Sequence, residues 1–399
     1  MENENKNISC QTLPSLLSSF VDTFVDFSVS GGLFLPPPPP PPETSTTTLQ
    51  TIFPQPTRLV AIGDLHGDLY KTKQALRLAG LIGSGDHWCG GATTLVQIGD
   101  ILDRGGDEIK ILYLFEKLKR EAFITGGRVI CMNGNHETMN VSGDFRYVTR
   151  EGLEEFKEYL FWYNVGNCMK KMCHGLIGNF VDPLDGLGDS FRVSMVRSEE
   201  VLSGMRARYA VIRPDGPIAT RFLSGNQTVV VVGDSIFVHG GLLPNHVEYG
   251  LERANEEISE WIRGVKGEVE RDLVRGRDSM VWSRRFSSEL AKDCDCAMLE
   301  HVIKTIPGVR RMIMGHTIQE SGINGVCDNK AIRIDVGMSK GCGNGLPEVL
   351  EIMGNSEVRI LTSNPLYKRG NESALIAEKK DGLGVLIPEM GPNQVEVKA

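Results

Sequence analysis

The chain lacks any uninterrupted run of about 18 or more apolar residues, the length that a helix needs to cross a membrane. We therefore expect no membrane-inserted segment. It also lacks an excess of basic charge, because 43 Lys and Arg stand against 51 Asp and Glu, for a net charge of -8. That balance argues against broad contact with nucleic acid or an anionic membrane surface. A local basic pocket for one phosphate remains compatible with it.

Cysteine is scarce, with nine residues in a chain of 399. That is too few for a secreted scaffold built on disulfides, so we expect reduced, mostly buried thiols in an intracellular protein. Two pairs lie close in sequence, Cys168 with Cys173 and Cys294 with Cys296. Their spacing differs from that of zinc fingers, and no histidines follow at finger spacing. Whether either pair forms a disulfide stays open, as does a redox role.

The beginning of the chain has no arginine before Arg58 and is acidic, unlike a plastid or mitochondrial presequence. Leu13–Leu35 is moderately apolar but is interrupted by two aspartates, and seven prolines follow at Pro36–Pro42. Such a run forms a polyproline II rod. We predict that residues 1–52 are a flexible tail with a linker, more a spacer than a site for SH3- or WW-type partners. Residues 366–399 are predicted to form a C-terminal tail.

Short apolar runs recur from Arg58 onward, and each stops at a glycine or small turn. Runs this short and continuous are typical of strands buried on both faces. Helical patterns at Tyr70–Ala79 and Glu108–Glu121 separate the first three, which predicts a βαβαβ beginning and an α/β class. The runs are Leu59–Ile62, Leu95–Ile98, Val129–Met132, Val229–Val232, Ser235–Val238 and Met312–Met314.

Residues able to bind metal follow these runs. Any one of them alone would more often be a turn or core residue, but loops at the carboxyl ends of strands gather at one sheet edge. Carboxylate, imidazole and amide oxygen together suit Mn, Fe or Zn better than Ca. Six ligands exceed the need of one ion that keeps a water, so we predict two divalent ions, bridged by Asp100, that activate a hydroxide for attack on a phosphate ester. The predicted ligands are Asp64, His66, Asp100, Asn135, His239 and His316.

Phosphate ester hydrolysis also needs positive charge on the phosphate oxygens and an acid for the leaving oxygen. Arg104 can present a bidentate fork, and Arg284 or Arg285 is a candidate for a second clamp. His136 adjoins the predicted ligand Asn135 and can act as the acid, with Asp103 as a hydrogen-bonding partner that favours its charged form.

Five glycine-flanked motifs carry a family resemblance that covers about residues 57–355. Together they resemble the signature motifs of the PPP phosphoprotein phosphatases. This resemblance implies the calcineurin-like metallophosphoesterase fold, a β-sandwich with flanking helices, in a catalytic domain at residues 53–365. The motifs are Gly63–Gly67, Gly99–Gly105, Gly134–Glu137, His239–Gly241 and Gly315–His316.

The same resemblance implies a role for each matched residue. It places His136 with Asp103 as the acid pair, and Arg104 with an arginine after Trp282 on the phosphate. The first metal would be held by Asp64, His66 and Asp100, and the second by Asp100, Asn135, His239 and His316.

Departures from the mainstream eukaryotic enzymes narrow the class. Those enzymes carry Leu-Arg-Gly-Asn-His-Glu, whereas this chain has Cys131-Met132-Asn133 before Gly134, and Ile334–Ser339 replaces their toxin-binding Ser-Ala-Pro-Asn-Tyr-Cys. A long helical insertion spans about residues 141–228, and we interpret the apolar face of its helix at Glu151–Asn164 as core packing. These departures resemble the Shewanella-like phosphatases of plants, in particular their non-plastid group.

That class implies a protein phosphatase that prefers phosphotyrosine, acts on phosphoprotein substrates and resists okadaic acid and microcystin. It implies the cytosol or the mitochondrial intermembrane space rather than the plastid, with the import oxidoreductase of that space as a partner. Two alternatives stay open. A dinucleoside polyphosphate hydrolase would share the metal platform, and an inactive phosphatase-like binding protein would lack a ligand or the acid, although none is missing here.

Overall fold

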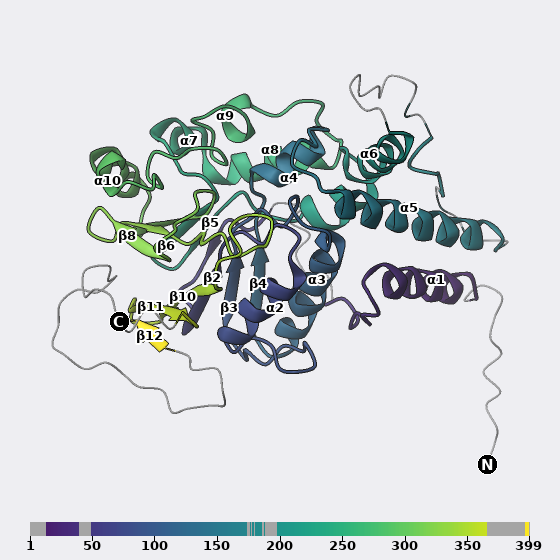
Figure 1. Ribbon diagram of the computed structural model, residues 1–399, viewed down its shortest axis with the longest axis horizontal. Coiled ribbons are helices and arrows are strands. Elements are labelled where there is room, and N and C mark those ends of the chain that lie inside the picture. Colours follow the sequence, from purple (N-terminus) through teal and green to yellow (C-terminus); the bar gives the residue numbers. More distant parts are fainter. Residues whose placement is uncertain are drawn as a thin grey trace, which may run out of the picture.

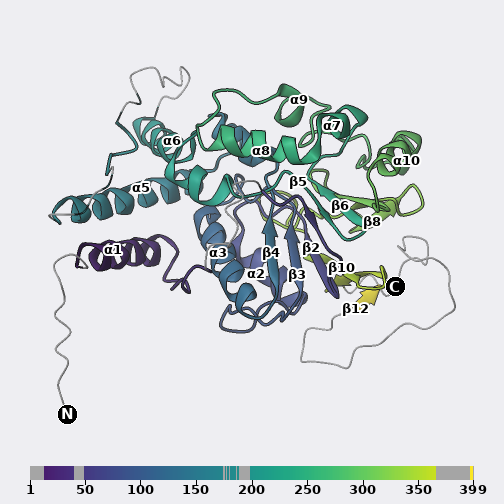
Figure 2. The same ribbon diagram turned by 180° about the vertical axis from the view of Figure 1, so that it is seen from behind.

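The computed structural model describes residues 13–39, 49–173, 176, 178, 180–185, 187, 198–364 and 396–398. Within them, two mixed six-stranded sheets form the centre of an α/β metallophosphoesterase fold, and helices flank both sheets (Figures 1 and 2). This architecture confirms the fold class predicted from the sequence. No helix of the described part combines the length and apolar character needed to cross a membrane.

The first sheet contains the predicted βαβαβ unit, in which three parallel strands alternate with two helices. Its strand order is β12-β11-β10-β2-β3-β4, and β10 pairs antiparallel with β2. The strand boundaries lie within one residue of the predicted runs, because runs of apolar residues buried on both faces leave little freedom in register. The elements are β2 (Arg58–Ile62), α2 (Leu69–Leu78), β3 (Thr94–Gln97), α3 (Glu108–Ile124), β4 (Arg128–Cys131), β10 (Glu348–Met353), β11 (Val358–Thr362) and β12 (Glu396–Lys398).

The second sheet has the order β1-β5-β6-β7-β9-β8. β6, β7 and β9 run parallel, whereas β5 pairs antiparallel with β6 and β8 pairs antiparallel with β9. The parallel strands end at the same edge, so the residues after β6 and β7 are brought together. The strands are β1 (Ile52–Phe53), β5 (Val229–Val232), β6 (Ser235–Val238), β7 (Arg311–Met314), β8 (Asn324–Val326) and β9 (Ala331–Arg333).

Short helices after the strands complete the two layers. α2 and α3 lie beside the first sheet, and the helices of the second half surround the second sheet (Figures 1 and 2). The remaining helices are α4 (Asn135–Val141), α7 (Pro244–Tyr249), α8 (Leu251–Ile262), α9 (Arg271–Val274) and α10 (Cys296–Thr305), with the short π-helix η1 (Ala219–Leu223) and the short 3-10 helix η2 (Ala291–Asp293).

The inserted stretch contributes two helices, α5 (Arg150–Lys171) and α6 (Glu199–Ile212), which pack against each other beside α3. The face of α5 that was interpreted as core packing is buried, with Leu153, Phe156 and Leu160 at most 6% exposed. That interpretation is confirmed, and the helix extends further than the sequence pattern indicated.

The predicted N-terminal tail needs correction over residues 13–39. Leu13–Val29 form helix α1, which packs along α5 (Figure 1). Val21 and Val25 are buried against Gly166, where an added Cβ would lie 2.7 Å from Val25 Cγ2. The aspartates do not break the helix, because Asp26 binds Arg221 at 2.6 Å and accepts a hydrogen bond from the Tyr113 hydroxyl. Residues 1–12, 40–48 and nearly all of the predicted C-terminal tail lie outside the described residues, although Glu396–Lys398 pair with β11.

The cysteines also differ in part from expectation. Cys296 at the start of α10 forms a disulfide with Cys327 in the β8–β9 turn, so the reduced state was wrong for these two residues. Cys294 and Cys296 are therefore not a bonded pair, and Cys168 and Cys173 are both free. The partner of Cys296 is 31 residues away in sequence and comes close only because α10 and the β8–β9 hairpin pack together.

Candidate metal centre and phosphate site

Each predicted ligand lies directly after a strand. Asp64 and His66 follow β2, and Asp100 follows β3. Asn135 begins α4 after β4, while His239 and His316 follow β6 and β7. The structure brings all six predicted ligands to the edge where the two sheets meet.

Several of these residues have a left-handed backbone, which non-glycine residues rarely adopt. The φ angles are 45° at His66, 56° at Asp100 and 67° at His316. Asp103 and Arg104 are also left-handed, at 68° and 63°. Such residues cost about 1–3 kcal/mol each and persist where the surroundings hold them in place, most often at functional sites. The strained loops turn the side chains back over the sheet edge.

Glycines at this edge let the backbone approach the carboxylates. A Cβ on Gly134 would lie 2.2 Å from an Asp100 carboxylate oxygen, and one on Gly315 would lie 2.4 Å from an Asp64 oxygen. Any side chain would therefore displace a predicted ligand. This is the physical reason for Gly-Asn and Gly-His in the two motifs.

The buried carboxylate of Glu137 connects two of the loops. It accepts backbone N–H groups from Asp100, Ile101 and Leu102 at 2.8–3.1 Å, and from Gly134 at 2.7 Å. One side chain thus satisfies four donors in the loops after β3 and β4. The relative position of Asp100 and Asn135 is set by this contact.

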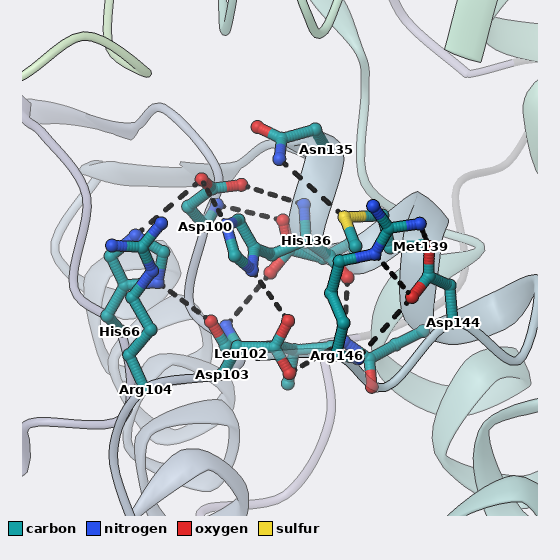
Figure 3. Close-up of polar contacts among 12 residues, drawn as sticks. His66, Asp100, Leu102, Asp103, Arg104, Asn135, His136, Met139, Asp144 and Arg146 are labelled. Carbon is teal, nitrogen blue, oxygen red and sulfur yellow. Dashed lines mark hydrogen bonds and ion pairs between the residues drawn. The ribbon is translucent and has the colours of Figure 1, made fainter. Parts of the chain in front are cut away.

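Asp100 lies close to the imidazoles of His66 and His136 (Figure 3) and also to that of His239. Its Oδ2 is 3.1 Å from His239 Nε2, 3.7 Å from His66 Nε2 and 3.8 Å from His136 Nε2. His239 Nε2 also lies 2.9 Å from the Asn135 side-chain oxygen. Two buried groups of potential ligands share Asp100, one with His66 and His136 and the other with His239 and His316. Such sharing fits a bridging role.

The outer nitrogens of two histidines are held by backbone carbonyls. His66 Nδ1 lies 2.9 Å from the Leu102 oxygen, and His239 Nδ1 lies 3.0 Å from the Ile98 oxygen. A carbonyl accepts only, so Nδ1 carries a proton in both rings and Nε2 is the nitrogen that faces Asp100. Burial lowers the pKa of His66 to about 4, which keeps its imidazole neutral. Burial opposes the charged ring of His239, but the Asp100 carboxylate outweighs it and raises the pKa of this histidine. Both rings thus turn Nε2 toward the predicted metal centre.

His316 has a buried Nε2 with no hydrogen-bond partner among the described residues. Burial, followed by the nearby His239, holds its pKa well below the usual value, so the ring is neutral and offers a lone pair. The backbone N–H of His316 donates to Asp64 at 3.2 Å. A buried lone pair beside two carboxylates is the environment that a cation completes, so these residues fit a pair of divalent ions.

His136 is arranged differently from the ligands. Its Nδ1 lies 2.6 Å from Asp103 Oδ2, in a charge-assisted hydrogen bond (Figure 3). Burial opposes the charged imidazole, but the carboxylates of Asp100 and Asp103 outweigh it and raise the pKa of His136. The ring therefore keeps a proton on Nδ1, and its Nε2 points toward the predicted metal centre. This geometry suits an acid more than a ligand.

The three candidate phosphate-binding arginines lie in different surroundings. The Arg104 guanidinium packs over the Tyr147 ring at 5.1 Å, and its Nε is buried without a partner in the described structure. Arg284 Nη1 donates to the His316 carbonyl at 3.1 Å, which places it beside the metal centre. Arg285 instead binds Asp278 at 2.9 Å. Geometry thus favours Arg284 over Arg285, a choice that the sequence left open.

Two buried charged residues at the site were missed from the sequence. Asp335 is 3% exposed, and its carboxylate hydrogen-bonds to that of Asp64. It follows β9 and precedes Gly337, the same pattern that marked the predicted ligands, so the signal was present. Arg208 on α6 reaches Asp103 at 3.1 Å, and no pattern in its helix distinguished it from Arg206.

Comparison with known proteins agrees with this site. The calcineurin-like phosphoesterase family matches residues 57–203. Shewanella-like protein phosphatase 2 of Arabidopsis thaliana is 60% identical over 397 residues, covering 99% of each chain. The chain belongs to the Shewanella-like protein phosphatases. It is thus an enzyme, a protein phosphatase on the metallophosphoesterase fold.

More distant relatives support the same family. Shewanella-like protein phosphatase 1 of Plasmodium berghei is 28% identical over 296 residues, covering 73% of this chain and 69% of the relative. Among solved structures, the cold-active protein-tyrosine phosphatase of a psychrophilic Shewanella species superposes with a TM-score of 0.55 at 21% identity. That match covers 82% of this chain and 86% of the other, and it supports the fold of this Shewanella-like phosphatase.

Proposed function

We propose that this Shewanella-like phosphatase hydrolyses phosphomonoesters on proteins, with a preference for phosphotyrosine, through a two-metal centre. The observation that carries the proposal is the arrangement around Asp100. His66, His239 and His136 all direct Nε2 toward its carboxylate, within 3.8 Å. Two bound divalent ions such as Mn would supply Lewis acidity and would lower the pKa of water to form a hydroxide nucleophile.

The side chains around the centre divide the remaining work. Asp64, His66 and Asp100 would hold one ion, and Asn135, His239 and His316 the other with Asp100 shared. Arg104, packed over Tyr147, and Arg284, bonded to the His316 carbonyl, would orient the phosphate by bidentate or paired hydrogen bonds. This holds the phosphorus in line with its attacking group, which contributes through positioning.

His136 would deliver the proton to the leaving oxygen. Its Nδ1–H is held by Asp103, so Nε2 is the nitrogen that faces the substrate. The two nearby carboxylates raise the pKa of His136, which keeps the ring charged at higher pH than a free histidine. After transfer of the Nε2 proton, the neutral ring remains oriented by Asp103.

The tyrosine preference is proposed from the class resemblance, and one feature of the site fits it. Tyr147 is 39% exposed, and its ring lies 5.1 Å from the His136 ring and beside Arg104. An aromatic face next to the phosphate-binding arginine could pack on the phenyl ring of a phosphotyrosine. The Shewanella protein named above is a protein-tyrosine phosphatase.

A peptide panel combined with metal analysis tests the proposal. We expect a purified sample with about two divalent ions per chain to release phosphate faster from phosphotyrosine than from phosphoserine peptides. An Asp100→Ala sample purified in parallel serves as the control for contaminating phosphatases. Equal rates on both peptide classes would remove the tyrosine preference, and faster hydrolysis of diadenosine tetraphosphate would favour the dinucleoside polyphosphate hydrolase.

The cellular location and the import oxidoreductase partner stay predictions from the resemblance. Fractionation of plant cells with an antibody to the chain would test the first, and co-purification would test the second.

A further inference from the structure

Arg208 is a fully buried arginine, 0% exposed, on helix α6 of the insertion. A buried guanidinium is strongly disfavoured unless every donor is paired, so its partners indicate what holds it there. No predicted role of the metal or phosphate site uses this side chain. Its position in a region outside the metal-binding loops makes it a separate feature.

The guanidinium reaches three partners at once. Nη1 donates to Glu108 Oε1 at 2.9 Å, and Nη2 donates to Glu108 Oε2 at 2.5 Å and to Asp103 Oδ1 at 3.1 Å. Nε donates to Asn140 Oδ1 at 2.7 Å. Its flat face lies 4.1 Å from the centre of the Phe156 ring on α5. The guanidinium group of Arg208 is thus fixed in both its plane and its direction.

These contacts determine how Asp103 holds His136. Oδ2 of Asp103 accepts from His136 Nδ1, while Oδ1 accepts from Arg208 and from Asn140 Nδ2 at 3.0 Å. The carboxylate cannot rotate without breaking both sets of bonds. Because Arg208 binds Asn140 Oδ1, the Asn140 amide must turn Nδ2 toward Asp103 and the His136 carbonyl.

We propose that Arg208 is a positioning residue for proton transfer, which fixes the Asp103 carboxylate and, through it, the direction of His136 Nε2. The proposal rests on the proposed function for the assignment of His136 as the acid. It also gives the insertion a second role besides packing. A displacement of α6 would turn the Asp103 carboxylate and lower the rate of proton transfer from His136, while the predicted metal ligands stay in place.

The test compares leaving groups with Arg208→Lys, which keeps the charge but cannot form the three-way fork. Phenyl phosphate needs a proton on its leaving oxygen, whereas 2,4-dinitrophenyl phosphate does not. We expect kcat on phenyl phosphate to fall by about 10- to 100-fold, the usual loss when an orienting partner is removed. On dinitrophenyl phosphate we expect a change of at most about threefold, because the acid contributes little there.

Arg206→Lys is the matched control, since Arg206 lies on the same helix and lines the groove between α5 and α6. It should leave both rates unchanged. An equal loss on both substrates for Arg208→Lys would overturn the proposal, because it would indicate general disruption. Combining Arg208→Lys with Asp103→Asn should add little to the loss from Asp103→Asn alone, whereas fully additive losses would also overturn it.

A second variant covers the case in which Arg208→Lys does not fold. Asn140→Ala removes the amide between Arg208, Asp103 and the His136 carbonyl, and it leaves every buried charge paired. We expect the same selective loss on phenyl phosphate, and an equal loss on both substrates would count against the proposal.

A readout independent of activity separates this inference from the proposed function. The proton in the 2.6 Å bond from His136 Nδ1 to Asp103 should give a low-field proton resonance that disappears in His136→Asn. It should persist in Arg206→Lys and shift or vanish in Arg208→Lys. An inactive wild-type protein with this pattern would refute the phosphatase assignment alone, and an unchanged resonance in Arg208→Lys would refute the positioning role.

Discussion

Two neighbouring groups of buried carboxylates in this phosphatase are neutralised in different ways. At the predicted metal centre, the basic neighbours of Asp64, Asp100 and Asp335 are imidazoles, with His239 Nε2 3.1 Å from Asp100, and His316 Nε2 is left without a partner among the described residues. On the other side of His136, Asp103 and Glu108 are joined by Arg208. The first group fits cations from solution, whereas the second is neutralised by an arginine of the chain.

The comparison teaches which part of the site depends on metal. Without bound ions, the carboxylates at the sheet edge should repel one another, whereas the contacts among His136, Asp103 and Arg208 should stay intact. Substitution in the second group should act on proton transfer while the ions stay bound. The four predictions below test this division, from the largest expected effect to the smallest.

Replacement of Asp100 should have the largest effect, because both predicted ions share its carboxylate. We expect Asp100→Ala to lose bound metal and to reduce phosphatase activity to background. Metal analysis and turnover of a phosphotyrosine peptide would measure both. Asp103→Asn is the control that should keep its metal. A full metal content in Asp100→Ala would show that Asp100 does not bridge the two ions.

Replacement of His136 should affect turnover alone. General acids contribute about 100- to 10,000-fold, so His136→Asn should lower kcat by that order while metal content stays unchanged. The exposed His301 on α10 offers a control, and His301→Asn should behave as the wild type. Near-normal turnover of His136→Asn on phenyl phosphate would contradict the assignment of the acid.

Removal of metal should lower stability. A ligand present at 100 times its dissociation constant stabilises the folded state by about 2.7 kcal/mol, so a chelator should shift thermal unfolding by several degrees. Differential scanning fluorimetry would measure the shift. Asp100→Ala should not respond to the chelator, and an unchanged wild-type Tm would mean that the buried carboxylates are neutralised without ions.

The smallest effect on activity is expected at Glu155, which lies beside Glu108 and affects the pH dependence of stability. Burial, followed by repulsion from Glu108, raises the pKa of Glu155 to about 8 from 4.5. The folded state therefore keeps a proton that the unfolded chain releases, and stability falls as pH rises from about 4.5 to about 8, by at most about 1.4 kcal/mol per pH unit.

Glu155→Gln should remove this dependence. Urea unfolding at pH 5.5 and pH 8 would show a smaller loss for the variant than for the wild type. Parallel curves for the two proteins would indicate that Glu155 is ionised in the folded state.

Much of the catalytic edge could be predicted because strand ends carry a local signal. A short apolar run, a glycine and then a polar residue identify where the backbone leaves a buried strand, and Asp64, Asp100 and His316 all follow this rule. Asp335, like His239, comes directly after an apolar residue at a strand end with a glycine shortly after it, and it was overlooked. Helix α1 was missed because its signal is not local. Asp22 and Asp26 interrupt its apolar pattern, and their partners, Lys170 and Arg221, are far away in sequence.

The sequence by itself determined the βαβαβ core and the six residues that converge after its strands, because strand burial and residue type are encoded within a few positions. Only the tertiary structure decided that Arg208 rather than Arg206 reaches Asp103, that Arg284 rather than Arg285 lies beside His316, and that Cys296 bonds to Cys327. Each of these choices depends on which face of a helix or loop meets a distant segment. No local pattern carries that information.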